Sequence, residues 1–211
     1  MTRIRAVVFD MDGVLIDARE WHYEALNRAL GLLGYTITRF DHLSTYDGLP
    51  TRRKLEMLSV ERGLPRGLHG FLNALKQQYT LQVVHARCNP VFQHEYALSR
   101  LKADGFTLAV ASNSVRATVE LMMRRSGLED YLDLLLSNED VEHPKPHPEI
   151  YLLAMERLAS PPEETLVIED NENGVESARA SGAHVMVVED PLDVTYDRIS
   201  AHIGAIEAVA A

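Results

Sequence analysis

Two carboxylates, Asp10 and Asp12, stand two positions apart directly after an apolar stretch that ends at Phe9. Gly13 follows them, and glycine permits a sharp backbone turn that directs both carboxylates into one pocket. Two negative charges this close are costly unless a cation or phosphate chemistry uses them. The motif alone fits an Asp-Gly turn with solvated carboxylates equally well.

A hydroxyl and an amide, Ser112 and Asn113, follow a second apolar run at residues 107–111. Such groups, together with nearby backbone N–H groups, hold phosphate oxygens. Taken alone, the pair is equally typical of a helix start, with Ser112 or Ser114 as the N-cap.

Lys145 lies between Pro144 and Pro146. Prolines on both sides restrict the backbone and hold the loop extended. A lysine fixed in this way is a placed positive charge, suited to a phosphoryl oxygen or an acyl phosphate. The alternative is a lysine that faces solvent in a proline-rich turn.

Two acidic residues, Glu169 and Asp170, follow the apolar run at residues 166–168. If they face Asp10, they form a set of oxygen ligands that suits Mg²⁺. The same residues also fit the acidic start of the next helix, where the helix dipole favours negative charge. The two interpretations are compatible.

Strands and helices alternate along most of the chain, which predicts an α/β fold with a doubly wound parallel (Rossmann-like) sheet. The predicted strands are residues 4–9, 107–111, 132–136, 166–168 and 184–188. The predicted helices between them are residues 115–126, 148–158 and 173–180. Ligands of such sheets bind beyond the carboxyl ends of the strands, where the polar residues described above stand.

Residues 17–90 differ from the rest, because helical patterns at 20–33, 51–62 and 67–79 are separated only by turns. We therefore predict a catalytic core at 1–16 and 91–211, with a small all-helical cap at 17–90 inserted after the first strand. Residues 83–88 are interpreted as the return linker.

The motifs taken together resemble the haloacid dehalogenase superfamily of phosphohydrolases. The resemblance covers the whole core and rests on Asp10-x-Asp12-Gly13-Val14, Ser112-Asn113, Lys145-Pro146 and Glu169-Asp170. The helical insertion resembles the cap of the β-phosphoglucomutase-like branch, on the looser match of residues 20–25 and 48–55.

The resemblance implies the chemistry of the two aspartates. Asp10 is the nucleophile and forms an aspartyl-phosphate. Asp12 protonates the leaving oxygen and then activates the water that hydrolyses the intermediate. An acid at this position is needed for an alkoxide leaving group and not for a carbon–halogen bond, which argues against the dehalogenase branch.

The resemblance also implies the cofactor and the groups that hold the phosphoryl group. Mg²⁺ is held by Asp10, the carbonyl of Asp12 and Asp170, with Glu169 as a ligand or as a neighbour of the ligands. The catalytic residues Lys145 and Ser112 neutralise and orient the phosphoryl group, and Asn113 binds the substrate.

The expected activity is that of a Mg²⁺-dependent phosphatase acting on a small phosphorylated metabolite, such as a sugar phosphate. The first alternative is a phosphomutase acting on a sugar phosphate, which differs in excluding water from the aspartyl-phosphate. The second is a non-catalytic sensor of phosphorylated metabolites on the same fold.

Two cap residues, His22 and Arg52, are expected to contact the substrate, although a surface histidine and a solvated charge run are competing interpretations. The chain departs from the family pattern at residues 92–95, where a Pro-Gly pair is usual. His94 and Glu95 either face the cleft there or form the first turn of an ordinary helix.

The net charge of −10 argues against a nucleic-acid partner, since the cluster Arg52, Arg53 and Lys54 is too short for a nucleic-acid arm. Cys88 is the single cysteine, so no intrachain disulfide can form. No apolar stretch approaches the roughly 20 residues of a membrane helix. We expect a cytoplasmic monomer whose partner is a small phosphorylated molecule.

Overall fold

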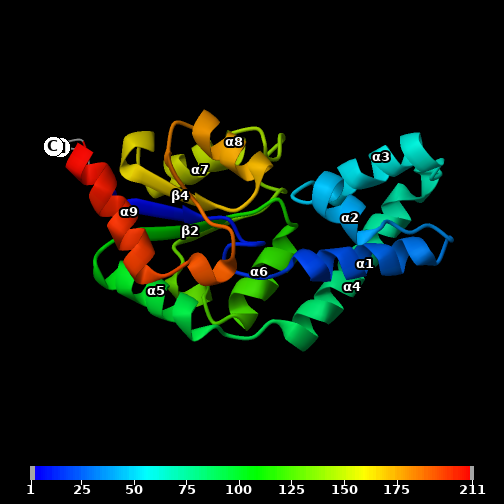
Figure 1. Cartoon of the computed structure of the whole chain (residues 1–211), viewed down its shortest axis with the longest axis horizontal. Helices are drawn as coiled ribbons and strands as arrows, with labels where there is room; N and C mark the ends of the chain where they lie inside the picture. The colour runs from blue at the N-terminus through cyan, green and yellow to red at the C-terminus, as the bar shows by residue number, and fades with distance from the viewer. Residues whose placement is uncertain (1–2, 210–211) are drawn as a thin grey trace. The chain divides into compact units, whose positions relative to one another are not determined.

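The computed structural model describes residues 3–209 (Figure 1). The chain divides into two compact units. One, here called the sheet unit, is formed by Met1–Asp17 and Asn89–Ala211, and the other, the helical unit, is Ala18–Cys88.

The sheet unit is built on five parallel strands in the order β3-β2-β1-β4-β5. The strands are β1 (Ala6–Phe9), β2 (Thr107–Ala111), β3 (Leu134–Leu136), β4 (Thr165–Glu169) and β5 (His184–Val187). Strand β1 lies in the centre, with Val8 in register with Ala109 on one side and Val167 on the other. All four of its residues are buried, as expected for a central strand covered on both faces.

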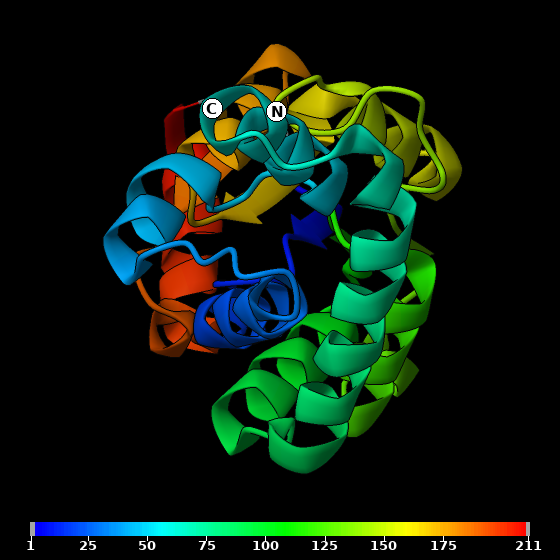
Figure 2. The ribbon, with the colours of Figure 1, turned by 90° about the vertical axis from the view of Figure 1, so that its right-hand side faces the viewer.

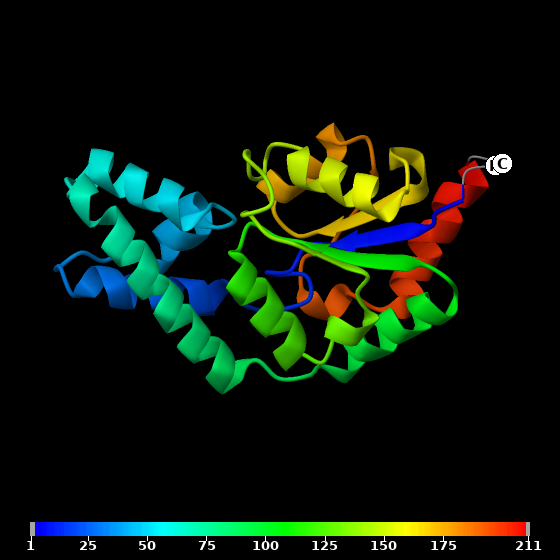
Figure 3. The same cartoon turned by 180° about the vertical axis from the view of Figure 1, so that it is seen from behind.

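Helices cover both faces of this sheet (Figures 1 and 3). One face carries α5 (Phe92–Ala103), α6 (Arg116–Arg125) and α9 (Tyr196–Val209), and the other carries α7 (Glu149–Leu158) and α8 (Glu172–Ala180). On the α7 side, Ile150 and Tyr151 pack with Val8 and its neighbours in a core cluster. The predicted doubly wound α/β fold is confirmed.

Short 3₁₀ turns complete the sheet unit. They lie at Glu129–Tyr131, Pro162–Glu164 and Pro191–Asp193. Among residues 3–209, no helix is long and apolar enough to cross a membrane.

The helical unit has a hydrophobic core of its own, and the course of its helices can be followed in Figure 2. Its elements are α1 (Arg19–Gly31), α2 (Arg39–Asp41), a π-helical turn (His42–Tyr46), α3 (Thr51–Arg62), a 3₁₀ turn (Arg66–Leu68) and α4 (His69–Arg87). Helices α1 and α4 pack against each other. The core cluster includes leucines of α1 and α3, among them Leu26, Leu30 and Leu55.

The prediction of a linker at residues 83–88 is wrong, because α4 continues to Arg87. The buried residues of α4 include Leu72, Lys76, Thr80 and Val84, which recur every four positions. Two members of this stripe, Lys76 and Thr80, are polar. The apolar pattern therefore ends before the helix does, although the buried face continues to Val84.

Candidate active site

Asp10 begins the site at the carboxyl end of the central strand. Its N–H still donates to the Ile168 carbonyl of β4 at 2.9 Å, so the backbone is held by the sheet up to this residue. The chain then turns at Gly13, whose φ is +93°. A Cβ at Gly13 would lie 2.0 Å from Asp170 Oδ2, so only glycine allows the two loops to approach this closely.

The ammonium of Lys145 joins the ends of three strands. Its Nζ donates to Asp10 Oδ1 at 2.6 Å, to Glu169 Oε1 at 2.7 Å and to the Ala111 carbonyl at 2.8 Å. An ammonium has three donors, and each is used here. The Lys145 side chain is only 3% exposed, so the interpretation as a solvent-facing lysine is wrong.

The electrostatics of this cluster favour a bound cation. Burial, followed by the negative charge of Glu169, holds the pKa of Asp10 well above its usual range, although Lys145 acts in the opposite direction. Burial disfavours the charged form of Lys145, but the carboxylates of Asp10 and Glu169 outweigh it and raise the pKa. Lys145 therefore stays protonated and contacts two acidic side chains, Asp10 and Glu169, beside which Asp170 adds a third carboxyl group.

Tyr151, on α7, is a member of the site that was not predicted. Its hydroxyl donates to Glu169 Oε1 at 2.5 Å, and Lys145 Nζ lies 4.7 Å from the centre of its ring. Burial and then the charge of Glu169 raise the pKa of Tyr151 well above its usual value, which keeps the phenol protonated as a donor. In the sequence it reads as an apolar core position of a helix, which it also is.

Asp12 is held by a second unpredicted residue, Ser114. The Ser114 hydroxyl donates to Asp12 Oδ2 at 2.9 Å, and the Ser114 N–H donates to the Ser112 hydroxyl at 3.0 Å. Helix α6 has Val115 at its N-cap and no side-chain cap hydrogen bond. The capping interpretation of the two serines is therefore wrong, because their hydroxyls serve the loop and the aspartate instead.

Asn113 fixes the loop that carries Lys145. Its Oδ1 accepts from the Lys145 N–H at 3.0 Å, and its Nδ2 donates to the Lys145 carbonyl at 3.3 Å. The Asn113 carbonyl in turn accepts from Asn138 Nδ2 at 2.9 Å. The side chain of Asn113, which was predicted to bind substrate, thus pairs with the backbone of Lys145 and holds that residue in position.

Three carboxylates form a group with the donors that Mg²⁺ prefers. Oxygen atoms of Asp10, Glu169 and Asp170 all lie within 4.8 Å of one another. A Cβ at Gly174 would lie 1.9 Å from Glu169 Oε1, so a glycine at the start of α8 makes room for that carboxylate. All-oxygen donors and an excess of negative charge fit a hard divalent cation.

The two predicted cap residues lie in the helical unit in different settings. His22 Nδ1, on α1, is 3.1 Å from Lys76 Nζ, on α4. The side chain of Arg52 is 88% exposed and pairs with Glu56 on its own helix at 3.5 Å. Of the basic cluster at the start of α3, Lys54 is the buried member.

His94 and Glu95 form part of the first turn of α5. His94 is buried, and its Nε2 lies 2.8 Å from the Pro191 carbonyl. A Cβ at Gly127 would lie 2.6 Å from Glu95 Oε1, so Glu95 packs on that glycine. Both residues serve the packing of the sheet unit, which supports the interpretation as an ordinary helix start.

The order of these groups along the chain is that of a known enzyme family. Residues 7–188 match the family model described as haloacid dehalogenase-like hydrolase. The chain belongs to this family. The predicted resemblance is confirmed, and the match spans both the motifs of the sheet unit and the helical insertion.

Relatives within the haloacid dehalogenase-like family carry phosphatase names. The chain is similar to a phosphorylated carbohydrates phosphatase of Thermotoga maritima, with 33% identity over 180 residues that cover 85% of this chain and 82% of that protein. It is also similar to a phosphoglycolate phosphatase of Nitrosospira multiformis, with 28% identity over 201 residues, 88% of this chain and 83% of that protein. The predicted enzyme class, a phosphoric monoester hydrolase of this family, is confirmed.

The fold is shared with solved members of the β-phosphoglucomutase-like branch. A crystal structure of β-phosphoglucomutase from Clostridium difficile superposes with a TM-score of 0.83 and covers 99% of this chain and 100% of its own. The two sequences are 20% identical, so the likeness speaks for the fold.

Proposed function

We propose that this hydrolase is a Mg²⁺-dependent phosphatase that acts on a small phosphorylated metabolite of the sugar phosphate type. The observation that carries the proposal is the Lys145 ammonium, which contacts both Asp10 and Glu169 at the carboxyl edge of the sheet. Placed positive charge beside a carboxylate nucleophile is what phosphoryl transfer requires, since positioning and charge stabilisation supply most of its catalysis. The relative named as a phosphorylated carbohydrates phosphatase supports the substrate class.

The two aspartates carry the covalent chemistry. The Asp10 carboxylate attacks phosphorus while the bond from phosphorus to the leaving oxygen breaks, and Asp12 gives its proton to that oxygen. The product at this stage is an aspartyl-phosphate. Asp12 then takes a proton from water, which attacks phosphorus, releases inorganic phosphate and restores the Asp10 carboxylate. Ser114 supports this role by fixing one oxygen of Asp12.

The surrounding residues place charge around the phosphoryl group. Lys145 neutralises it and Ser112 orients it, while Asn113 keeps the Lys145 loop in position. Mg²⁺ would be held by Asp10, Asp170 and the Asp12 carbonyl. When bound, it would shield the negative charge of the carboxylates from that of the phosphoryl oxygens. Glu169 accepts hydrogen bonds from Lys145, Tyr151 and the Asp170 N–H, which favours a supporting role for it beside the metal ligands.

We assign substrate selection to the helical unit. The His22–Lys76 pair offers an imidazole and an ammonium to an anionic or hydroxylated substrate, whereas the exposed Arg52 is the weaker candidate. The phosphomutase alternative is supported by the fold shared with β-phosphoglucomutase. The sensor alternative requires that the motif residues, all of which are present, have no catalytic role. We further expect the enzyme to be a cytoplasmic monomer.

The test is a panel of phosphorylated sugars, nucleotides and small acids, assayed for free phosphate with Mg²⁺ and with EDTA. Asp10→Asn is the inactive variant, and Asp130→Asn, an exposed aspartate on the surface of the sheet unit, is its matched control. Release that needs Mg²⁺, disappears in Asp10→Asn and persists in Asp130→Asn supports the proposal. Isomerised sugar phosphate without free phosphate would move the assignment to phosphomutase. Neither product, from any compound, would favour the sensor.

A further inference from the structure

The loop that carries Lys145 presents a second cluster of polar side chains on its surface. His143 and His147 lie four positions apart, and Glu149 opens α7 directly after them. We propose that these three residues bind a divalent transition metal, with Zn²⁺ as the ion that fits best. The site is separate from the proposed phosphoryl transfer, because Lys145 is buried whereas the two histidines are 63% and 51% exposed.

The ligand atoms already stand at nearly the spacing that a metal needs. His143 Nδ1 lies 3.0 Å from Glu149 Oε2, and His147 Nδ1 lies 3.7 Å from the same oxygen. A tetrahedral zinc ion with bonds of about 2.1 Å separates its ligand atoms by about 3.4 Å. The two observed distances bracket this value, and ligand atoms of all three residues lie within 4.8 Å of one another.

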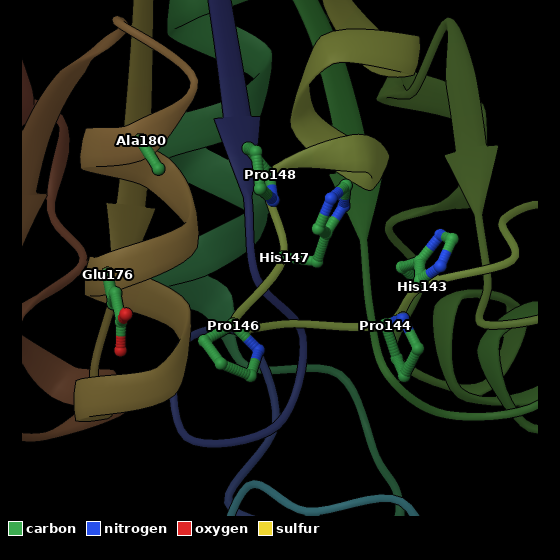
Figure 4. Close-up of a pocket in the computed structure, with 7 residues that line it drawn as sticks. All are labelled: His143, Pro144, Pro146, His147, Pro148, Glu176 and Ala180. Atoms are coloured by element: carbon green, nitrogen blue, oxygen red, sulfur yellow. The ribbon is translucent and has the colours of Figure 1, made fainter.

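The two imidazoles lie next to each other on the surface of the loop (Figure 4). Their ring centres are 4.8 Å apart, and the rings are tilted by 38°. They border an open depression of about 500 Å³ that is also lined by Pro144, Pro146 and Glu176. An ion here would therefore keep a coordination position open to water or to a small anion.

The chemistry of the donors selects the class of metal. Two imidazoles and one carboxylate suit zinc, copper and nickel, whereas Mg²⁺ and Ca²⁺ prefer oxygen ligands alone. Two neutral histidines and one carboxylate leave a bound divalent ion with a net charge of +1, which an exposed site tolerates. The cluster is thereby distinct in kind from the all-oxygen group of Asp10, Glu169 and Asp170.

The backbone holds the ligands in place before any metal binds. Three prolines (Pro144, Pro146 and Pro148) restrict the chain across the cluster. The Glu149 carboxylate is fixed by the N–H groups of Glu142 and His143, at 2.9 and 3.0 Å. Less side-chain freedom is lost on binding, which raises affinity for a preformed site.

Without metal, His143 Nδ1 lies 3.0 Å from Glu149 Oε2 at the surface. An exposed pair of this kind contributes between about 0 and 1 kcal/mol to stability. The Glu149 N–H also donates to His147 Nδ1 at 3.3 Å, and a metal bound at that nitrogen would replace this hydrogen bond. A metal competes with the proton for the imidazole and joins the loop to the start of α7. The expected effect is to stabilise the loop that positions Lys145.

Zn²⁺ binding is measured by isothermal titration calorimetry on the full chain in excess Mg²⁺, so that the carboxylate group is already occupied. We expect one Zn²⁺ per chain and an affinity that falls at least about tenfold in His143→Ala and in His147→Ala. His85→Ala removes an exposed imidazole of the helical unit and should leave the titration unchanged. Unchanged affinity in both loop variants, or binding lost only in Asp170→Asn, would overturn the proposal.

A thermal melt provides a readout that needs neither activity nor calorimetry. Zn²⁺ should raise the Tm of the wild-type protein and of His85→Ala, because an ion that binds only the folded state stabilises it. The same concentration should raise the Tm of the two loop variants less. Equal increases in all four proteins would show that zinc binds elsewhere.

Discussion

Lys145 is the side chain on which the arrangement of the other groups depends. It draws the ends of β1, β2 and β4 together through Asp10, Ala111 and Glu169. A buried ammonium is unfavourable without partners, and a buried carboxylate is unfavourable without a counter-charge. The cluster is therefore stable only as a set, which ties the stability of the sheet unit to the chemistry of its edge.

Replacing Lys145 by methionine keeps the length of the side chain and removes its charge. We expect a loss of activity of about 10²-fold or more and a loss of about 3–5 kcal/mol in the free energy of unfolding, because two carboxylates remain buried without their partner. Denaturant unfolding and the phosphate-release assay measure the two effects. Lys102→Met is the matched control, since Lys102 pairs with Asp133 at the surface and should cost less than about 1 kcal/mol.

A double variant separates charge from packing at this position. Glu169→Gln in the Lys145→Met background removes one of the uncompensated carboxylates, so it should restore part of the lost stability and none of the activity. A double variant that is less stable than Lys145→Met would contradict this account of the cluster.

Ser114 tests whether the orientation of Asp12 matters for the reaction. Ser114→Ala removes the 2.9 Å hydrogen bond to Asp12 Oδ2, so we expect kcat to fall by about tenfold with KM unchanged. Ser114→Thr retains a hydroxyl and should recover most of the rate. Ser99→Ala, at a half-buried serine on α5 whose hydroxyl donates to the Tyr96 carbonyl, serves as the control. A rise in KM at constant kcat would instead mean that Ser114 contacts the substrate.

Among the elements, those with a clear pattern were predicted closely. Strand β2 has the bounds expected from its run of apolar residues, because a buried parallel strand requires them on both faces. The prediction ended α4 at residue 79, since the next position of its buried stripe is Thr80, which an apolar pattern does not register. Periodicity predicts an element when burial and apolar character coincide, and it fails where a polar side chain is buried.

The same contrast explains the site. Asp10, Lys145 and Glu169 were predictable because each stands at or beyond a strand end, and parallel strands bring those ends to one edge. Ser114 and Tyr151 were missed as site residues because their partners, Asp12 and Glu169, are 102 and 18 positions away. Their local patterns describe a turn and a helix core, and only the three-dimensional contacts reveal what their hydroxyls do.

The loop after β3 is held by Asp140, which offers a pH-dependent test of an element. Burial alone would raise its pKa, but hydrogen bonds from Ser137 and the charge of Arg116 outweigh it, so the pKa lies below its usual value of 3.8. A carboxyl with a lowered folded-state pKa contributes stability above its unfolded pKa, and that stability is lost as the pH falls through the folded value.

Asp140→Asn should therefore lower the free energy of unfolding by about 1–3 kcal/mol at neutral pH. The difference from the wild-type protein should shrink as the pH falls below the unfolded value of 3.8 and vanish below the folded one. Urea unfolding at a series of pH values measures it, with the exposed Asp130→Asn as control. A deficit that is independent of pH would assign the effect to packing.

Considered as a whole, the protein carries a net charge of −10, and part of that excess is concentrated at the carboxyl edge of the sheet. We expect Mg²⁺ to raise the Tm of the chain and EDTA to lower it. An ion at one hundred times its Kd stabilises the folded state by about 2.7 kcal/mol. Asp170→Asn should reduce the increase, and Asp130→Asn should not. An equal increase in both variants would indicate that Mg²⁺ acts elsewhere on the acidic surface.

The chain divides into two units that carry different parts of the proposed function. All residues proposed for the chemistry lie in the sheet unit, from Asp10 to Asp170, whereas the candidates for substrate selection lie in the helical unit. Each unit also has a hydrophobic core cluster formed by its own residues. A shortened chain, in which a Gly/Ser linker replaces residues 18–88, should therefore fold with a cooperative melt.

This shortened chain should retain Mg²⁺-dependent hydrolysis of a generic ester such as p-nitrophenyl phosphate and lose the preference among sugar phosphates that the full chain shows. The Asp10→Asn variant of the shortened chain controls for contaminating phosphatases. If the shortened chain folds and binds Mg²⁺ but hydrolyses nothing, the helical unit supplies a group to the chemistry, and His22 and Lys76 are the first residues to substitute. If it keeps the full preference, selection belongs to the sheet unit and the role assigned to the helices is wrong.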